Sequence, residues 1–388
     1  MKRRIAIITG SRAEYGLLRW LIDEIHHAPH FELQLIVTGM HLSPEFGLTS
    51  REIEKDGYSI THQVEMLVSS DTAVGVTKSM GLGMIGFADA FALLKPNLVV
   101  VLGDRFEIFA AASAAMVARL PIAHLHGGES TEGAYDEAFR HAITKMAHLH
   151  FVAAEPYRQR VIQLGEAPDY VYTVGGLGLD NIQKLSLLSR EDLAAALNLS
   201  WGPKNLLVTF HPCTLELKSS EEQIQTLLAA LETLEYTHFI FTMPNADDGN
   251  FVIRQRIEAF ARKHSNAYVY TSLGQLLFLS CLQFVDGVVG NSSSGLIEVP
   301  SFKKGTINIG HRQTGRIKAK SVIDCDPTAQ SILNAVEILY SSAFQQDLET
   351  LVNPYGNGSA SENIMRVLRQ IDFKSLGKKS FYDMPAYA

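Results

Sequence analysis

The stretch from Leu98 to His141, LVVVLGDRFEIFAAASAAMVARLPIAHLHGGESTEGAYDEAFRH, decides the expected fold. Its first five residues, Leu98–Leu102, are apolar and mostly β-branched, and a glycine, two charged residues and a helix-like run of small residues follow them directly. A second short apolar run, Pro121–Leu125, then ends in histidine and glycine. Buried parallel strands that alternate with crossover helices have this pattern. The stretch therefore predicts a doubly wound α/β domain with a parallel sheet.

Ionisable residues follow both of these predicted strands. Asp104 comes after the first strand, His126 and Glu129 come after the second, and Asp136 and Arg140 open the next predicted helix, four residues apart. That spacing places the last two on one helix face. Any one of the five could be a helix cap or a surface ion pair. Because ligands of open α/β sheets bind at the carboxyl ends of the strands, we predict that the set forms a site for acid/base chemistry.

The amino-terminal turn, GSRAEYG at residues 10–16, follows the predicted strand Ile5–Ile8 and precedes a helix. Backbone N–H groups in such a turn can bind an anion, and Arg12 adds a full positive charge. An ordinary strand-to-helix turn is the alternative. The GxGxxG spacing of a dinucleotide site is absent from this turn, so the sequence predicts no nicotinamide cofactor.

The alternation of strands and helices restarts after the glycine-rich segment 171–181, VYTVGGLGLDN. We therefore predict a first domain over residues 1–175 and a second over 176–359. The remaining segment, 360–388, contains a helix that no strand follows, and we expect it to pack against the first domain.

A second group of candidate residues belongs to the second half of the chain. The segment GNSSSGLIE, residues 290–298, follows a buried strand, and its hydroxyls and N–H groups suit a diphosphate. A glutamate one turn later could accept both ribose hydroxyls, although a serine cap with a first-turn glutamate is the alternative. The candidate nucleotide-binding residues of this half are His211, Asn245, Ser292, Ser293, Ser294, Glu298 and Arg316.

Composition limits the classes of partner and the compartment. The net charge of −7 and the pI near 6.1 argue against nucleic acid or an anionic membrane as a partner. The three cysteines are far apart without CxxC spacing, so neither a disulfide framework nor a metal site is expected. The apolar run after Met1 is too short for a signal peptide, and no run is long enough for a membrane span. We expect a cytoplasmic protein.

Six motifs together resemble those of the hydrolysing UDP-N-acetylglucosamine 2-epimerases of bacterial sialic acid biosynthesis. They are GSRAEYG, GDRFE, HLHGGE, YDEAFRHAITKM, TFHP and GNSSSGLIEVPS, and the resemblance covers nearly the whole chain. It implies two Rossmann-like domains of the glycosyltransferase-B type with an interdomain cleft, and neither a metal nor a nicotinamide cofactor. We also expect a homo-oligomer, a dimer or a tetramer. The residues that the resemblance implies for UDP are Arg12, His211, Ser292, Ser293, Ser294 and Glu298, and those for the sugar are Asp104, Glu129, Asp136 and Arg140.

The reaction implied by the resemblance is anti elimination of UDP to a 2-acetamidoglucal, followed by hydration to free N-acetylmannosamine. In some relatives a glutamate that acts in acid/base chemistry stands where this chain has His126, so His126 and Glu129 remain alternative bases. Three other functions stay open: the same reaction on a UDP-2,4-diacetamido-2,4,6-trideoxyhexose, a UDP-sugar-dependent glycosyltransferase, and a nucleotide-sugar sensor.

Overall fold

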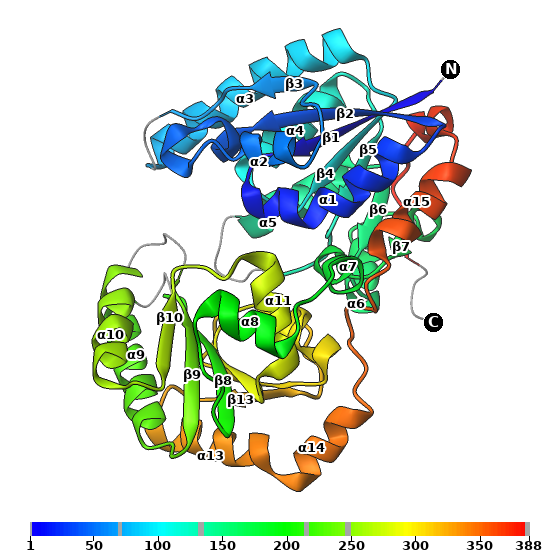
Figure 1. Cartoon of the computed structure of the whole chain (residues 1–388). Helices are drawn as coiled ribbons and strands as arrows, with labels where there is room; N and C mark the ends of the chain where they lie inside the picture. Colours follow the sequence, from blue (N-terminus) through cyan, green and yellow to red (C-terminus); the bar gives the residue numbers. More distant parts are fainter. Residues whose placement is uncertain (1, 69–71, 131–135, 213–216, 245–249, 385–388) are drawn as a thin grey trace. The chain divides into compact units, whose positions relative to one another are not determined.

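The computed structural model describes residues 2–68, 72–130, 136–212, 217–244 and 250–384, which belong to two compact units (Figure 1). The first unit comprises Met1–Asn181 and Gly358–Ala388, and the second comprises Ile182–Asn357. The boundary after Asn181 lies beyond the predicted boundary at 175, because Leu177 is still buried in the core of the first unit.

The first unit has a seven-stranded parallel sheet in the order β3-β2-β1-β4-β5-β6-β7, as far as the described residues show. The strands are β1 (Arg3–Thr9), β2 (Phe31–Thr38), β3 (His62–Val64), β4 (Leu98–Leu102), β5 (Ile122–Leu125), β6 (Leu149–Val152) and β7 (Val171–Thr173). The helices are α1 (Arg12–His27), α2 (Ser50–Lys55), α3 (Ala73–Leu94), α4 (Phe106–Val117), α5 (Asp136–Met146), α6 (Glu155–Gln163), the boundary helix α7 (Asp180–Lys184) and α15 (Ala360–Gln370). The strand order reverses between β1 and β4, and this is the place where such sheets bind ligands.

Both faces of this sheet are buried, which explains why its central strands are apolar throughout. In β1, Ile5 and Ile7 belong to the core cluster under α1 and α15, whereas Ala6 and Ile8 belong to the cluster under α3 and α4. Because side chains alternate between the two faces of a strand, a strand covered on both sides reads as one continuous apolar run. The predicted parallel sheet is confirmed.

Helix α15 returns from the end of the chain to the first unit and lies beside α1 (Figure 1). Its buried side chains Ile364, Met365 and Leu368 belong to the same core cluster as α1. The Asp180 carboxylate accepts hydrogen bonds from the backbone N–H groups of Ala360 and Ser361, each at 2.8 Å. A residue 180 positions earlier in the chain therefore caps the start of this helix.

The second unit repeats the architecture with the strand order β10-β9-β8-β11-β12-β13, all parallel within the described residues. Its strands are β8 (Lys204–Thr209), β9 (Thr237–Thr242), β10 (Ala267–Tyr270), β11 (Gly287–Gly290), β12 (Gly305–Ile309) and β13 (Val322–Cys325). Its other helices are α8 (Arg190–Leu197), α9 (Leu217–Glu232), α10 (Asn250–Lys263), α11 (Gly274–Phe284), α12 (Ser294–Ile297), α13 (Ala329–Tyr340) and α14 (Ser342–Glu349).

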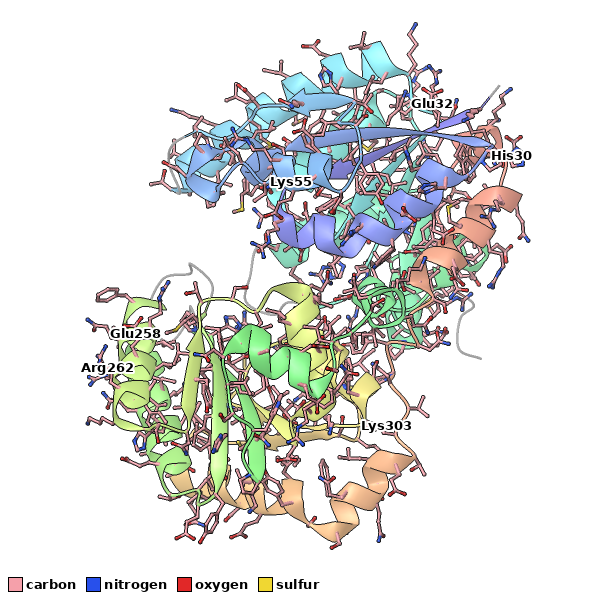
Figure 2. The ribbon with its side chains drawn as sticks, in the orientation of Figure 1. His30, Glu32, Lys55, Glu258, Arg262 and Lys303 are labelled. Carbon is pink, nitrogen blue, oxygen red and sulfur yellow. The ribbon has the colours of Figure 1, made fainter. Side chains whose placement is uncertain are left out.

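Helix α10 shows how these helices pack on the second sheet. Ile253 and Ile257 are buried in the core cluster under the helix, whereas Glu258 and Arg262 point away from the sheet (Figure 2). This spacing of buried and exposed residues is that of an amphipathic helix. Among the described residues, no helix is both long enough and apolar enough to span a membrane.

Candidate active site

Arg140 and the two carboxylates beside it form the centre of the candidate site in the first unit. Asp104 follows β4 after Gly103, whose φ of +76° lets the chain turn at the end of the strand. Arg140, which is buried on α5, pairs through Nη2 with Asp104 Oδ2. Its Nη1 lies 3.7 Å from Glu129 Oε2. One guanidinium thus connects the ends of β4 and β5 to α5.

His126 holds Glu129 from the other side. The Nδ1 atom of His126 lies 2.9 Å from Glu129 Oε1, and the backbone N–H of Leu177 donates to its Nε2 at 3.3 Å. An imidazole that accepts a hydrogen bond at Nε2 and donates at Nδ1 is neutral, with its proton on Nδ1. His126 has the left-handed φ of +61°, which turns the chain directly after β5. Because the N–H of Leu177 donates to Nε2, the lone pair of this nitrogen is already used.

Asp136, the first residue of α5, completes this group. Burial raises the pKa of the Asp136 carboxyl, and so does the neighbouring charge of Asp104, whereas Arg105 and Arg140 act in the opposite direction. A raised pKa makes a carboxyl easier to protonate, which suits a proton donor. All five residues predicted for acid/base chemistry, Asp104, His126, Glu129, Asp136 and Arg140, thus come together at the carboxyl edge of one sheet.

Sequence analysis missed a second acidic group at the same edge. Arg105 donates to both carboxylate oxygens of Glu107, at 2.8 and 3.2 Å, and its Nε lies 4.0 Å from Glu14 Oε1. Glu14 Oε2 accepts the N–H of Gly10 at 2.6 Å. Burial raises the pKa of Glu14 to about 7. The sequence contains a signal for Glu14, because Ser11 and Glu14 have the S-x-x-E spacing of a capping box.

Arg12, which we predicted to bind phosphate, lies at the start of α1 in the first unit. Its side chain is 59% exposed and its Nε is 3.8 Å from Glu52 Oε2, so it is available to a ligand. The backbone of the turn is organised by Ser11, which caps α1 by accepting the N–H of Glu14 at 3.4 Å.

In the second unit, Asn291 joins the ends of β8 and β11. Its side chain accepts the N–H of His211 at 2.7 Å and donates to the carbonyl of His211 at 2.9 Å. Burial, together with the nearby charge of Arg312, lowers the pKa of His211 to about 4, so this histidine is neutral at pH 7. Arg312 and Gln313 both donate to the carbonyl of Asn291, at 3.1 and 2.8 Å. Sequence analysis did not predict the roles of Asn291 and Gln313.

The serine segment after β11 differs from its prediction in one respect. Helix α12 is a single turn, Ser294–Ile297, so the expected contribution of a helix dipole to anion binding is small. Glu298 is the residue that ends this turn, and its Oε2 atom is buried. Burial raises the pKa of Glu298 to about 7. The Ser293 side chain does not cap α12, whereas the Ser292 hydroxyl accepts the N–H of Ser294 at 3.4 Å and the Ser294 side chain hydrogen-bonds Glu298.

Two candidates of the second half remain, Asn245 and Arg316. Asn245 lies outside the described residues. Arg316 is half-buried in the turn after β12, where its N–H donates to the carbonyl of Gln313 at 3.4 Å. Of the predicted nucleotide residues in the second unit, the structure therefore brings together His211 and the serine segment, through Asn291.

Comparison with known proteins identifies relatives over almost the full length of the chain. A family model described as UDP-N-acetylglucosamine 2-epimerase matches residues 23–369. The chain is 40% identical to a Campylobacter jejuni protein named GDP/UDP-N,N'-diacetylbacillosamine 2-epimerase (hydrolyzing), over 99% of this chain and 100% of that protein. It is 39% identical to the Escherichia coli polysialic acid biosynthesis protein P7, over 99% of this chain and 98% of that protein.

A solved structure has a similar fold. The crystal structure of UDP-GlcNAc 2-epimerase from Neisseria meningitidis bound to UDP-GlcNAc matches with a TM-score of 0.80 at 16% identity, over 95% of this chain and 100% of that one. This likeness, together with the two sheet topologies, confirms the predicted pair of Rossmann-like domains of the glycosyltransferase-B type.

Proposed function

The chain belongs to the UDP-N-acetylglucosamine 2-epimerase family, and from this membership we propose which substrate it converts and which residues act on it. It is a hydrolysing UDP-sugar 2-epimerase. The proposed substrate is UDP-N-acetylglucosamine, and the proposed products are UDP and free N-acetylmannosamine. The observation that carries this proposal is the contact chain of Asp104, Arg140, Glu129 and His126, with Asp136 beside it at the same sheet edge.

The chemistry of the sugar favours elimination. No carbonyl activates the C2 proton of a hexose, so removal of that proton needs a leaving group at the neighbouring carbon. As the C1–O bond to UDP breaks, the electron pair of the C2–H bond forms a C1=C2 double bond and a base takes the proton. Water then adds its oxygen to C1, and an acid delivers a proton to C2 on the opposite face. The result is inversion at C2 and a free hydroxyl at C1.

The hydrogen bonds of His126 bear on the choice between the two predicted bases. His126 Nε2 already accepts a hydrogen bond from Leu177, and its Nδ1–H is directed to Glu129. We assign the removal of the C2 proton to Glu129, with His126 as its positioning residue. Asp136, whose pKa is raised, is the proposed acid of the hydration step. Arg140 keeps Glu129 and Asp104 in place.

The proposed nucleotide site uses mainly residues of the second unit. His211 and the serine segment suit the diphosphate, and Glu298 suits the ribose hydroxyls, because its buried oxygen is without a hydrogen-bond partner among the described residues. Arg12 lies in the first unit, and its role as a phosphate ligand stays a prediction. The first unit thus performs the proposed sugar chemistry, and the second holds the leaving group.

A second substrate has support from a relative. The name of the Campylobacter jejuni protein gives a diacetylbacillosamine nucleotide, which is a 2,4-diacetamido-2,4,6-trideoxy sugar. The same elimination and hydration would convert this sugar, because C1 and C2 are alike in both. The two candidates differ only in the groups at C4 and C6.

A proton NMR time course in deuterated water tests both candidates with the purified protein and no acceptor. Free N-acetylmannosamine with deuterium at C2, formed together with an equal amount of UDP, is the expected result. Turnover of the UDP-diacetamido sugar alone would select the second candidate. If both sugar nucleotides stay intact, the epimerase proposal is wrong, and a glycosyltransferase that needs an acceptor becomes the better explanation.

A further inference from the structure

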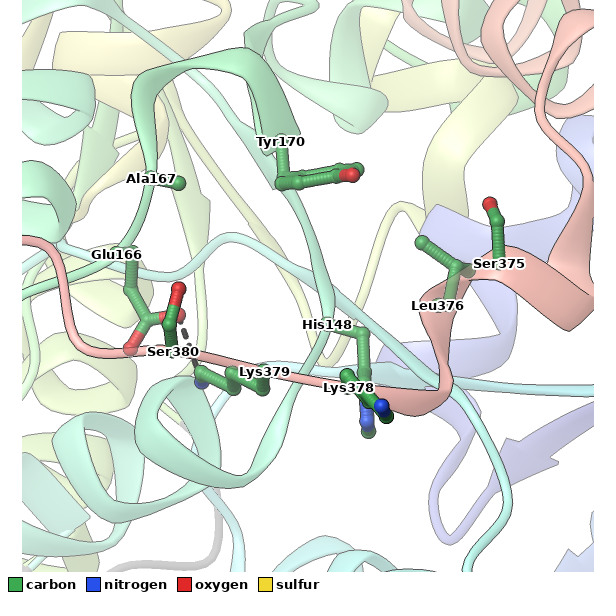
Figure 3. A pocket seen from close by; sticks show the side chains of 9 residues that line it. All are labelled: His148, Glu166, Ala167, Tyr170, Ser375, Leu376, Lys378, Lys379 and Ser380. Carbon is green, nitrogen blue, oxygen red and sulfur yellow. Dashed lines mark ion pairs between the residues drawn. The ribbon is translucent and has the colours of Figure 1, made fainter.

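Residues 378–382 of the first unit lie beside a small pocket. The pocket is lined by His148, Glu166, Ala167, Tyr170, Ser375, Leu376, Lys378, Lys379 and Ser380 (Figure 3). Two lysines and a histidine in one pocket suggest an anion site. However, Lys379 is already paired with Glu166, as the dashed line in Figure 3 shows, so its charge has a partner within the protein. The contacts of Lys379 point to a different role.

Lys379 caps the C-terminal end of α5, the helix that carries Asp136 and Arg140. Its ammonium group donates to the backbone carbonyls of Lys145 and Ala147, each at 2.6 Å, and to that of Thr144 at 3.4 Å. The last carbonyls of a helix lack partners within the helix, and a positive charge there is also favoured by the helix dipole. One side chain therefore donates to two carbonyls at the end of α5 at short distance and makes a longer contact with a third.

A buried carboxylate holds this ammonium group in place. Glu166 Oε2 lies 2.6 Å from Lys379 Nζ, and its Oε1 lies 2.6 Å from Lys145 Nζ. The Nε2 of His150 is 3.0 Å from Glu166 Oε2, and burial lowers the pKa of His150, so the imidazole donates in its neutral form. Burial alone would raise the pKa of Glu166, but these hydrogen bonds outweigh it and lower the pKa to about 2. Glu166 is thus a fixed negative charge at neutral pH.

The residues that follow Lys379 also contact the region around Gly165 and Lys145. The backbone N–H of Tyr382 donates to the carbonyl of Gly165 at 2.9 Å. The Phe381 ring covers Gly165 so closely that a Cβ atom on this glycine would lie 2.3 Å from the ring, and Lys145 Nζ lies 4.8 Å from the ring centroid. We call residues 379–382 the C-terminal clip.

A continuous path of contacts connects the clip to the candidate site. Thr144, whose carbonyl accepts from Lys379, donates its hydroxyl to Nδ1 of His124 at 3.1 Å. The Nε2–H of His124 donates to the carbonyl of Gly103 at 2.8 Å. Gly103 directly precedes Asp104, which pairs with Arg140 on the same helix. Helix α5 is therefore held against the end of β4 at two places, through Arg140 and through Thr144.

We propose that Lys379 is a positioning residue for the reaction. By capping α5 from the C-terminal clip, it holds Asp136 and Arg140 at the spacing from Asp104 that proton transfer needs. This inference rests on the proposed function, because it assigns these residues to the sugar. A rigid helix transmits a displacement at one end to the other, and small displacements of reacting groups cost large factors in rate.

The test compares Lys379→Met, Lys379→Arg and Lys378→Met with the wild type. Lys379→Met keeps the length of the side chain and removes the charge, and Lys378→Met removes the same charge from the exposed neighbouring lysine. We expect Lys379→Met to lower kcat by about tenfold or more while KM changes less than about twofold, since uniform binding is not affected. Lys379→Arg should recover part of kcat, because a guanidinium can also donate to several carbonyls.

Hydrogen exchange of the amides of residues 141–147 adds a readout that does not depend on turnover. We expect these amides to exchange faster in Lys379→Met than in the wild type and in Lys378→Met, at temperatures where all three proteins are folded. Equal exchange, or equal kcat in the two Met variants, would overturn the proposal. If the wild type converts neither sugar nucleotide, the proposed function fails, and exchange alone decides whether the clip holds α5.

If Lys379→Met does not fold, Phe381→Ala replaces it. This variant removes the ring from Gly165 and Lys145 but keeps every hydrogen bond of Lys379. A smaller fall of kcat at unchanged KM, together with faster exchange of residues 141–147, supports the proposal. Unchanged kcat and unchanged exchange contradict it.

Discussion

Glu129 is the residue on which the proposed chemistry depends most. Each of its carboxylate oxygens faces a different group, His126 on one side and Arg140 on the other. Such contacts hold a base in one orientation. His126 contacts this carboxylate through Nδ1, and its Nε2 accepts the N–H of Leu177. We therefore expect His126 to orient Glu129 and not to contact the sugar itself.

Replacing Glu129 by Gln tests this assignment. The amide keeps the size of the side chain and cannot take up a proton, so kcat should fall by about 10² or more, which is a typical loss for a general base. Affinity for UDP, measured by titration calorimetry, should stay the same. His126→Asn is the comparison, and we expect it to lower kcat less. If His126→Asn has the larger effect, the imidazole is the base.

Glu14 makes stability depend on pH. Its pKa in the native state is about 7, above the unfolded value of 4.5, so the native state binds the additional proton. The resulting stabilisation is fully present below pH 4.5 and is lost as the pH rises through 7, because the charged form is then buried. This should amount to about 1–3 kcal/mol.

Thermal unfolding at a series of pH values measures this effect. Glu14→Gln keeps an acceptor for the N–H of Gly10, but its amide cannot ionise. The stability of this variant should therefore change less between pH 4.5 and 7 than that of the wild type. Glu54→Gln, on the exposed side of α2, is the control and should follow the wild type. Parallel curves for all three proteins would show that Glu14 does not titrate in this range.

At the scale of elements, the parallel pairing of β8 and β11 depends on Gly290 at its end. A Cβ atom on this residue would lie 1.9 Å from the carbonyl oxygen of Thr209, and its φ of +141° is rare for other residues. Only glycine lets the end of β11 approach β8 closely enough for Asn291 to bind both backbone groups of His211.

Gly290→Ala should therefore destabilise the second unit by about 1–3 kcal/mol and weaken UDP binding. Differential scanning calorimetry and UDP titration measure the two effects. Gly16→Ala is a matched control, because this glycine lies within α1 and a Cβ atom added to it would meet no neighbouring group within 4 Å. Alanine there should be neutral or slightly stabilising. Equal stability of the two variants would mean that the strands can separate at little cost.

At the scale of the whole molecule, the chain leaves the first unit after Asn181 and returns to it at Gly358. Asp180 connects the two boundaries. It lies next to the first one, and its carboxylate accepts the two N–H groups at the start of α15. A carboxylate from the middle of the chain thus caps the start of the returning helix.

Asp180→Ala should detach the start of α15, since two buried N–H groups lose their acceptor. We expect a loss of about 1–3 kcal/mol in the stability of the first unit and easier proteolysis near residue 360. Limited proteolysis with mass spectrometry locates the cleavage. Asp169→Ala removes an exposed carboxylate of the same unit and should be cut like the wild type. An Asp180→Ala protein as resistant as the control would show that side-chain packing alone holds α15.

The sequence by itself determined the architecture and much of the candidate site. The central strands were recognisable because parallel strands covered on both faces are continuous apolar runs, and each ends in glycine and polar residues. The same pattern located Asp104, Glu129 and Asp136, since side chains that follow parallel strands share one edge of the sheet. The edge strands β7 and β13 were missed, because both contain polar residues and so lack the continuous apolar run of a central strand.

Only the tertiary structure decided which groups these residues contact. His126 and Glu129 were equal candidates for the base until Leu177, 51 residues later, was found at the Nε2 of His126. The caps of α5 and α15 come from Lys379 and Asp180, at separations that no local pattern contains. Hydrogen bonds and burial depend on distances in space, and folding brings together residues that the order of the chain keeps apart. The tautomer, the pKa shifts and the helix caps were therefore readable only from the folded chain.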